Sequence, residues 1–314
     1  MTIRNATPAD IPAIVQLLKA SLGDVSSKKS VDYWNWKHVT NPFGPSPVLV
    51  AEEEGQLIGV RAFMRWDWQE GGKIYRALRA VDTATHPAHQ GRGIFKKLTL
   101  QLVETASLEG YDFIFNSPNT QSTPGYLKMG WEEWGKMPLW IRPVLSLRKY
   151  QPAVFAAYHQ QLQEADLEKL PLAGKEYTGL STVVSPAYFQ WRYRQCPVKE
   201  YGLYKTADAW IFFSVKEKNR GMELRVCQVL QEGRENDPSV FKAIRKLAIE
   251  LGCRFITVSG LQQVPALLLL RYGYLPAAAI SVTITIRRLA NEPFYQSLHG
   301  KKDWMLETGA VELF

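Results

Sequence analysis

A glycine-rich turn between an expected strand and an expected helix constrains this chain more than any other feature. Residues 76–85 are typical of a strand and residues 94–109 of a helix, and the turn between them contains Gly91 and Gly93. Such a turn gathers backbone N–H groups at the positive end of a helix, a geometry that binds phosphate. Glycines let the ligand come close because they lack a Cβ. Three basic side chains add positive charge there: Arg92, Lys96 and Lys97.

Two common phosphate-binding loops do not fit this turn. A P-loop has four residues between its glycines and then Gly-Lys with a hydroxyl residue, and the segment has neither. A dinucleotide-binding loop has a third glycine, whereas Phe95 and Lys96 stand at the next positions here. A short Gly-x-Gly is by itself also compatible with a basic turn that only caps a helix.

The run Gln90-Gly91-Arg92-Gly93-Ile94, which follows a His-Pro turn, resembles the acetyl-CoA pyrophosphate loop of the GNAT acyltransferases. That loop usually has the pattern Gln/Arg-x-x-Gly-x-Gly/Ala. The chain departs from it at the last position, where Phe95 replaces a small residue. The departure removes one position of close approach but keeps the backbone N–H.

A second family signature follows downstream. Asn119 precedes Tyr126 by seven residues, and Met129-Gly130-Trp131 ends the segment. This is similar to the Asn and Tyr that GNAT enzymes carry on one helix ending in a Gly-aromatic step. Two signatures in this order extend the resemblance over residues 1–143.

The resemblance implies an α/β (α+β) fold with two GNAT-like domains, each a mixed, mostly antiparallel central sheet flanked by helices. A length of 314 residues suits two domains. We expect a catalytic, acetyl-CoA-binding domain over residues 1–145, a linker with a helix over 146–180 and a degenerate GNAT-like domain over 181–314. Residues 131–134 and 139–141 are expected to complete the first sheet.

The first domain opens with a clear helix signal. Thr7 stands at the N-cap, Pro8 at the first helical position and Asp10 at the third. Apolar residues at helical spacing follow, namely Ile11, Ile14, Val15 and Leu18. Further on, residues 48–51 and 57–68 predict a β-hairpin.

The second half of the chain repeats the first in a weaker form. Residues 188–192 echo residues 33–37, and Tyr272-Gly273-Tyr274 parallels Met129-Gly130-Trp131. Self-similarity of this kind is typical of a duplicated domain. A chance likeness between two α/β halves is the alternative.

The chemistry is not repeated. Residues 231–237 contain three acidic side chains and no Gly-x-Gly, so this turn would repel a pyrophosphate. Matching the helix ends places Leu269 opposite Tyr126 and Gln262 opposite Asn119. We therefore interpret the second half as a degenerate copy that packs against the first and can wall the acceptor site.

The resemblance also implies how acetyl-CoA is held. In GNAT enzymes the pantetheine arm pairs with the splayed strand before the loop, and that strand end is Thr83-Ala84-Thr85 here. The backbone from Gly91 to Lys96 would hold the pyrophosphate. The full set of implied cosubstrate-binding residues is Thr83, Ala84, Thr85, Gln90, Gly91, Arg92, Gly93, Ile94, Phe95, Lys96 and Asn119.

Two residues are candidates for proton transfer. Tyr126 matches the family tyrosine that protonates the CoA sulfur, and a phenol keeps its proton at pH 7; the alternative is a core tyrosine. Asp82 lies in an apolar strand, where burial can raise the pKa of a carboxyl so that it accepts the amine proton. The alternative is a strand-end Asp bonded to nearby backbone. Asn119 binds the pantetheine, caps the helix or does both.

Other polar and aromatic residues fit structural roles as well as functional ones. His86 and His89 titrate near neutral pH but fit a turn shaped by Pro87. An aromatic cluster can stack a substrate or pack in the core: Trp34, Trp36, Trp66 and Trp68.

Composition limits the classes of ligand and partner that the chain is expected to bind. A hydrophobic content of 46% and a charged content of 22% are typical of a globular protein, and the net charge of +8 suits anionic CoA. The basic residues are dispersed, which argues against nucleic acid. Three cysteines without metal spacing, Cys196, Cys227 and Cys253, favour a reducing compartment and no metal site. With no apolar leader and no span long enough for a membrane, we expect a cytoplasmic protein.

The sequence thus predicts an acyl-CoA-dependent N-acyltransferase, with acetyl-CoA as cosubstrate and the primary amine of a small molecule as acceptor. Transfer would be direct, in a ternary complex, because no cysteine lies near the loop in sequence. Two alternatives stay open. One is a non-catalytic acyl-CoA-binding or scaffolding protein, and the other is a different CoA-thioester reaction on this fold, such as O-acyl transfer or decarboxylation.

Overall fold

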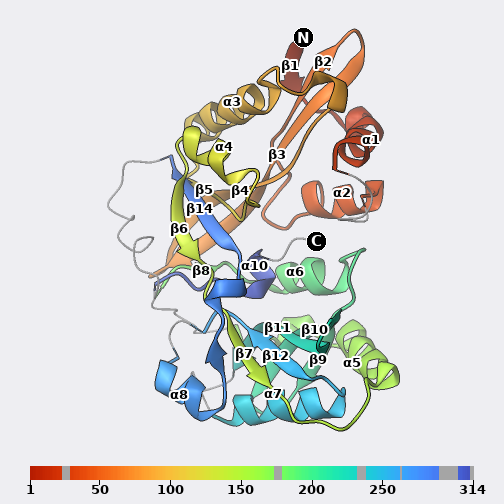
Figure 1. The fold of residues 1–314 in the computed structure, drawn as a ribbon, viewed down its shortest axis with the longest axis vertical. Helices are drawn as coiled ribbons and strands as arrows, with labels where there is room; N and C mark the ends of the chain where they lie inside the picture. The colour runs from red at the N-terminus through yellow and green to blue at the C-terminus, as the bar shows by residue number, and fades with distance from the viewer. Residues whose placement is uncertain (23–28, 173–178, 232–237, 262–263, 290–302, 312–314) are drawn as a thin grey trace. The chain divides into compact units, whose positions relative to one another are not determined.

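The structure is a computed structural model. It describes the whole chain except residues 23–28, 173–178, 232–237, 262–263, 290–302 and 312–314 (Figure 1). The described residues form two compact units. The first holds residues 1–135 with 283–289, and the second holds residues 136–282 with 303–311.

The first unit is built on a mixed sheet with the strand order β1-β2-β3-β4-β5-β14-β6. The β4–β5 pair is parallel, whereas β1–β2, β2–β3, β3–β4 and β5–β14 are antiparallel. The strand bounds are β1 (Thr2–Asn5), β2 (Val48–Glu53), β3 (Gln56–Glu70), β4 (Lys73–Thr85), β5 (Phe113–Asn116), β6 (Glu132–Lys136) and β14 (Thr283–Arg288).

Helices cover both faces of this sheet. One face packs on α3 (Ile94–Leu108), whose Leu98 and Leu102 are buried against Phe63. Neighbouring strand residues Val60 and Ala62 point the other way, into the core under α1. The remaining helical elements are η1 (Pro8–Asp10), α1 (Ile11–Leu22), α2 (Val31–His38), η2 (Pro87–His89) and α4 (Thr123–Lys128).

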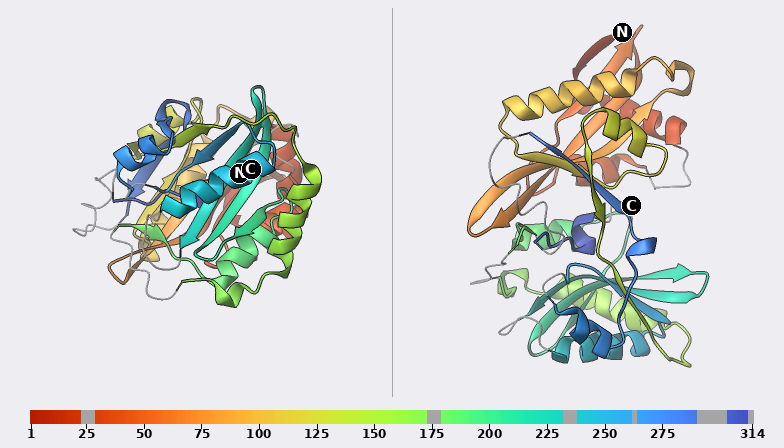
Figure 2. Two further views of the ribbon diagram at one scale, coloured as in Figure 1. Left: turned by 90° about the horizontal axis from the view of Figure 1, so that it is seen from below. Right: turned by 60° about the vertical axis from the view of Figure 1, so that its left-hand side comes forward.

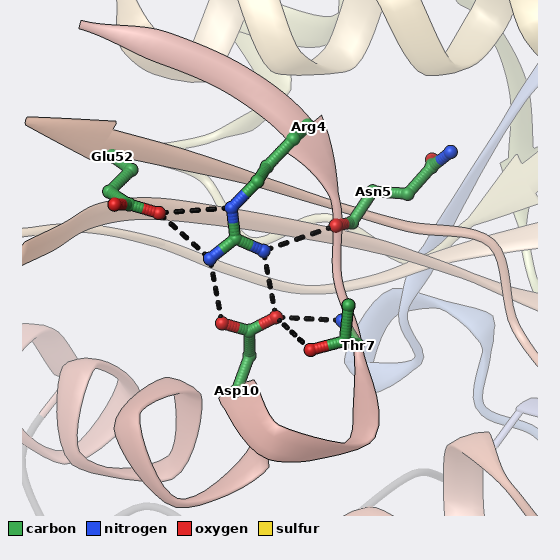
Figure 3. Close-up of polar contacts among 5 residues, drawn as sticks. All are labelled: Arg4, Asn5, Thr7, Asp10 and Glu52. Atoms are coloured by element: carbon green, nitrogen blue, oxygen red, sulfur yellow. Dashed lines mark hydrogen bonds and ion pairs between the residues drawn. The ribbon is translucent and has the colours of Figure 1, made fainter. Parts of the chain in front are cut away.

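A polar network fixes the start of the first helix, as the sequence predicts (Figure 3). The carboxylate of Asp10 accepts hydrogen bonds from the Thr7 backbone N–H at 2.7 Å and from the Thr7 hydroxyl at 2.8 Å. The guanidinium of Arg4 donates two 2.8 Å bonds to the same carboxylate and a 2.9 Å bond to Glu52. The Arg4 bonds hold the pKa of Asp10 well below its usual range. This network ties β1, β2 and the helix entry together.

The second unit has its own sheet, in the order β13-β7-β12-β11-β10-β9. Its strands are β7 (Trp140–Pro143), β9 (Gly202–Lys205), β10 (Ala209–Lys218), β11 (Gly221–Gln231), β12 (Phe255–Val258) and β13 (Leu275–Pro276), and a short β8 (Ser181–Thr182) lies outside the sheet order. Its helical elements are α5 (Pro152–Glu164), η3 (Leu167–Lys169), α6 (Pro186–Phe189), η4 (Gln190–Arg194), α7 (Pro238–Glu250), α8 (Ala266–Arg271), η5 (Ala278–Ile280) and α10 (Thr308–Val311). The mixed, mostly antiparallel sheets flanked by helices confirm the expected fold class. In the left view of Figure 2, α7 lies across the strands.

One expected strand is in the other sheet. Residues 139–141 were expected to complete the first sheet, but β7 pairs with β12 and β13 in the second. The place beside β5 is taken by β14, from near the end of the chain, with Ile284 and Ile286 buried. The expectation was wrong because both segments are short apolar strands, and the choice of partner edge depends on the folded chain.

The helix expected in the linker contributes to the second unit. Leu162 of α5 is fully buried, and the ring of Phe155 makes an edge contact with Phe213 of β10 at 6.0 Å between centroids.

Candidate functional site

A cavity of about 680 Å³ opens in the first unit where β4 and β5 part. It brings together eight of the residues singled out in the sequence, which are Asp82, Thr83, Ala84, Thr85, Gln90, Phe95, Asn119 and Tyr126. Residues that the sequence did not single out also line it, among them Lys29, Arg61, Asn116 and Ser117. The cavity therefore lies between the end of β4, the turn before α3 and the start of α4.

The two parallel strands separate because their pairing stops early. β4 and β5 pair from Ala77 with Phe113 to Arg79 with Phe115. β5 then ends at Asn116, whereas β4 continues to Thr85, paired on its other side with β3. The edge of β4 beyond Arg79 thus faces the cavity instead of β5. An extended ligand can pair with such an edge as an additional strand would.

A β-bulge shapes the middle of this edge. Arg61 pairs with Thr83 and Ala62 with Val81, so Asp82 is the extra residue of β4. Its φ is +30°, which few residues other than glycine adopt. A strained residue is retained where the surrounding structure holds it in place, often at functional sites.

The carboxylate of Asp82 is held by two side chains of α2. Its Oδ2 lies 2.6 Å from Nζ of Lys37 and 2.9 Å from Nε2 of His38. Burial opposes its charge, but Lys37 and His38 outweigh burial and lower the pKa of Asp82. The sequence left open a raised pKa or a strand-end Asp bonded to nearby backbone, and the lowered pKa does not fit the first of these. The charged Lys37 was not visible from the strand sequence, and it makes the carboxylate a weak base.

Lys37 and His38 are themselves buried. Burial opposes the charge of Lys37, but Asp82 and Tyr33 offset it and the pKa of Lys37 is raised. Burial lowers the pKa of His38, whose Nδ1 lies 2.9 Å from the Ser46 hydroxyl. Sequence reasoning missed both residues. The available signal was a Lys-His pair at the end of an aromatic helix, a common place for exposed cations.

Tyr126 lies at the wall of the cavity and is bound by an arginine. Nη2 of Arg61 donates a 2.7 Å hydrogen bond to the phenol oxygen. Arg61 is fully buried, and its guanidinium also lies 5.6 Å from the ring of Phe95. Because the phenol oxygen accepts from Arg61, its own hydrogen is available for another acceptor. Arg61 was not predicted, since a lone arginine in an apolar strand gives no motif.

Phe95, the departure from the family loop, packs on the tyrosine. The rings of Phe95 and Tyr126 meet edge to face, with centroids 5.7 Å apart. A Cβ on Gly125 would lie 3.4 Å from the Phe95 ring. The aromatic side chain thus fills space beside α4 and helps to fix Tyr126.

The glycine turn has the expected geometry. Gly91 and Gly93 have φ values of +77° and +73°, and a Cβ on either would meet no atom within 4 Å. The first amide of α3 that donates within the described chain is that of Lys97, to the Gly93 carbonyl at 3.0 Å. The amides of residues 91–96 donate no hydrogen bond to other described residues. The glycines therefore serve the turn conformation and leave its amides open to a ligand.

The side chains of the turn differ in their burial and in their contacts. Arg92 forms a bidentate pair with Glu53, at 2.7 and 2.8 Å, which offsets part of its charge. Ile94 is buried in the core, so its backbone alone can face a ligand, whereas Lys96 is exposed. A Cβ on Gly59 would lie 2.6 Å from Ile94, so the small residue in β3 lets α3 pack closely.

Asn119 stabilises the turn that precedes α4. Its Oδ1 accepts a 2.8 Å bond from the backbone N–H of Ser122 and a 2.9 Å bond from the Ser122 hydroxyl. Ser122, and not Asn119, is the N-cap of α4, so Asn119 does not cap the helix, which begins at Thr123 beside Pro124. The family signature places its Asn and Tyr on one helix, whereas here Asn119 lies before α4, because the proline starts the helix.

The remaining candidates have structural roles. His86 accepts a bond from the Ala88 N–H at 3.3 Å, and His89 lies 2.6 Å from Arg92, so both belong to the turn. The four tryptophans of the aromatic cluster are buried in the core. Within the described chain, no group of His, Cys, Asp and Glu side chains can hold a metal ion, and no helix is long and apolar enough to cross a membrane.

The splayed β4 edge, the open turn and Tyr126 lie close together in the first unit, and comparisons with known proteins show which family this unit resembles. An acetyltransferase (GNAT) domain profile matches residues 2–134. The chain is 30% identical over 147 residues to the L-methionine sulfoximine/L-methionine sulfone acetyltransferase of Salmonella typhimurium, covering 44% of this chain and 84% of that one. It is 31% identical over 112 residues to the L-amino acid N-acyltransferase MnaT of Escherichia coli, covering 34% and 63%.

Solved structures share the fold along most of the chain. A GCN5-related N-acetyltransferase from Anabaena variabilis has a TM-score of 0.62 at 16% identity, covering 92% of this chain and 73% of that one. Eis1 from Mycobacterium abscessus has a TM-score of 0.59 at 14% identity, covering 92% and 74%. The sequence relatives and the domain profile, rather than these structures, show that the chain belongs to the GNAT acetyltransferases and is an N-acetyltransferase.

Proposed function

We propose that the first unit transfers an acetyl group from acetyl-CoA to the primary amine of a small molecule, in one ternary complex. One observation carries the proposal, namely that a single cavity adjoins the unpaired edge of β4 and the Arg61-bonded Tyr126. The open amides of residues 91–96 lie in the turn after β4 and at the start of α3. These are the three parts that a CoA thioester needs, an extended groove, a phosphate-binding turn and a proton donor.

The pantetheine arm would pair with the β4 edge at Thr83–Thr85. The pyrophosphate would accept hydrogen bonds from the amides of residues 91–96, where α3 also begins with its positive end. The exposed Lys96 adds a charge, while Arg92 contributes less because Glu53 holds it. Phe95 leaves the amide free and turns its ring toward Tyr126.

The proposed proton transfers follow from the hydrogen bond that Tyr126 accepts from Arg61. Its oxygen accepts from Arg61, so its own O–H can be donated to the CoA sulfur. The amine nitrogen attacks the thioester carbon, the C–S bond breaks, and the sulfur takes the proton of Tyr126. The amine nitrogen loses one proton to solvent, and solvent returns one proton to the tyrosine oxygen. The products are therefore an amide and a free thiol.

The role that we propose for Asp82 differs from that of a general base. Its low pKa makes it a weak base, but a charged carboxylate at the bulge can accept a hydrogen bond from the incoming amine. We propose that Asp82 orients the acceptor and that Lys37 keeps it charged. The acceptors in the names of the two sequence relatives are amino acids or their sulfoximine analogues. A molecule with an amine and an anionic group fits a cavity that also contains Lys29 and Arg61.

The second unit is proposed to be a degenerate copy without a CoA site. Of the expected differences, the acidic turn and Gln262 lie outside the described residues, but Leu269 is described and fully buried. It cannot donate a proton.

A thiol-release assay with acetyl-CoA and a panel of amines, led by L-amino acids and methionine sulfoximine, tests the proposal. We expect turnover that requires both substrates and an acetylated amine by mass spectrometry. Binding of acetyl-CoA without turnover on any amine would instead support a scaffolding role. Acylated alcohols, or carbon dioxide release from a malonyl thioester, would indicate another CoA reaction.

A further inference from the structure

A second pocket, of about 600 Å³, lies within the second unit and takes no part in the proposed reaction. It is formed by the end of β7, the segment after it, one side of α7 and the residue that follows α8. The lining residues are Arg142, Arg148, Lys242, Arg245, Lys246, Ile249, Glu250 and Tyr272.

The helix α7 supplies the basic side of this pocket. Lys242, Arg245, Lys246 and Ile249 follow the i, i+3, i+4, i+7 spacing, so they share one face of the helix. The three cations are exposed, while Ile244 and Leu247 turn the other face into the core. The left view of Figure 2 shows this helix across the sheet.

The charge in the pocket is one-sided. Five cationic side chains meet one carboxylate, Glu250, which accepts a 3.1 Å hydrogen bond from Tyr158. Within the residues that the structure describes, none of the five forms an ion pair. An ordinary solvated helix face would alternate signs, because like charges at i,i+4 repel as Lys242 and Lys246 do here. A bound anion would offset this repulsion.

A partly buried arginine points to the same ligand. Nη1 of Arg142 is buried and has no hydrogen-bond partner among the described residues. Its guanidinium lies 5.5 Å from the ring of Tyr274, which fixes its plane. Arg142 also lines the pocket, where its guanidinium can donate to a phosphate oxygen.

The rest of the wall is apolar. Ile249 lies beside Tyr272, whose ring stacks on Phe241 at 5.1 Å with an interplanar angle of 28°. The pocket therefore offers cations for phosphate groups and an apolar surface for a ring. Its volume is within the range of about 300 to 1,000 Å³ typical of small-molecule sites.

We propose that this pocket binds a small molecule carrying two or more phosphate groups and a ring, of the class of nucleoside polyphosphates. Three guanidinium groups and two ammonium groups match several phosphates, since guanidinium binds phosphate in a bidentate manner. The volume of about 600 Å³ suits a small molecule, whereas a nucleic acid strand needs an extended basic groove.

Calorimetric titration of the full chain with ATP as the probe tests the proposal, with pyrophosphate and adenosine as separate arms. We expect ATP to bind more tightly than pyrophosphate and adenosine to bind weakly. The double variant K242E/K246E should weaken ATP binding about tenfold or more, because it reverses two charges in the pocket. The matched control K216E/K218E changes the net charge equally on exposed residues of β10 and should leave the affinity within about twofold.

A Gly91→Val background separates this site from the first unit. If ATP binding disappears with Gly91→Val and persists in K242E/K246E, the ligand occupies the acetyl-CoA site and the proposal is overturned. Equal weakening by the control pair, or tighter binding of a single-stranded oligonucleotide than of ATP, would overturn it too. Thermal unfolding of each variant shows whether lost binding reflects lost structure.

Discussion

The two units share a bulge but not its chemistry. In the first, Arg61 stands opposite the bulge and Asp82 is the extra residue. In the second, the β10–β11 pair shifts register between Phe212 and Phe213, and Cys227 is the extra residue. The Arg61 and Asp82 positions thus correspond to Phe212 and Cys227, which are both buried. Both units therefore have the β-bulge, but only the first has charged side chains at it. The bulge belongs to the fold, whereas the proposed site depends on the side chains.

The helix after the site shows the same division. Gly130 and Gly273, which follow α4 and α8, have φ values of +87° and +76°. Four residues earlier stand Tyr126 in one unit and Leu269 in the other, and both are buried. A buried position accepts either side chain, so packing preserves the helix end without preserving the acid.

The largest effect is expected at the bulge itself. Asp82→Asn should lower the free energy of unfolding by about 3 to 5 kcal/mol, because Lys37 is left buried without its charged partner. Adding Lys37→Met should restore much of the loss, which makes the first unit resemble the neutral bulge of the second. Urea unfolding measures both. Equal instability of the single and double variants would show that the ion pair is not the cause.

Next comes the tyrosine that the second unit lacks. Tyr126→Phe should lower kcat about 100-fold while the Kd for acetyl-CoA stays nearly unchanged, because the phenol proton is used only during transfer. Tyr274→Phe in the second unit is the control and should leave kcat as it is. Stopped thiol release and calorimetry give the two quantities. A parallel loss of binding and turnover would remove the proposed acid role.

A smaller effect is expected at the turn. Gly91→Val should weaken acetyl-CoA binding about 30-fold, since valine resists a φ of +77° and its side chain crowds the phosphate site. Gly55→Val is a matched control, because Gly55 has the same φ and equally open surroundings in the β2–β3 hairpin. Both should cost similar stability. Unchanged acetyl-CoA affinity in the first variant would refute the assignment of the turn.

The smallest effect concerns pH. The pKa of His38 is lowered in the folded state, so the unfolded chain binds a proton first as pH falls. Stability from this residue is fully present above its unfolded pKa of about 6.5 and declines below it. His38→Gln should flatten the dependence of the free energy of unfolding between about pH 7 and 5. An identical slope in the variant would mean that other groups dominate.

Sequence predicted the turn and the elements around it, because these follow from local patterns of glycine, capping residues and apolar spacing. Tyr126 was singled out only by the resemblance to the GNAT signature. It did not predict Arg61 or Lys37, since their roles arise from a bulge and a helix far apart in the chain. For the same reason, the sequence did not predict that the pKa of Asp82 is lowered. The partner of β5 was missed because the sequence of a short strand does not specify which distant segment pairs with it.

The exchange of β7 and β14 has a consequence for synthesis on the ribosome. The sheet of the first unit is completed by a strand whose Thr285 bonds to Asn116, 169 residues earlier. At usual rates of translation, the edge of β5 waits roughly ten to thirty seconds for its partner to emerge. An open strand edge is prone to pair with other chains during such a delay. The nascent chain is therefore most prone to such pairing after Asp82 and the proposed acid Tyr126 have already been synthesised.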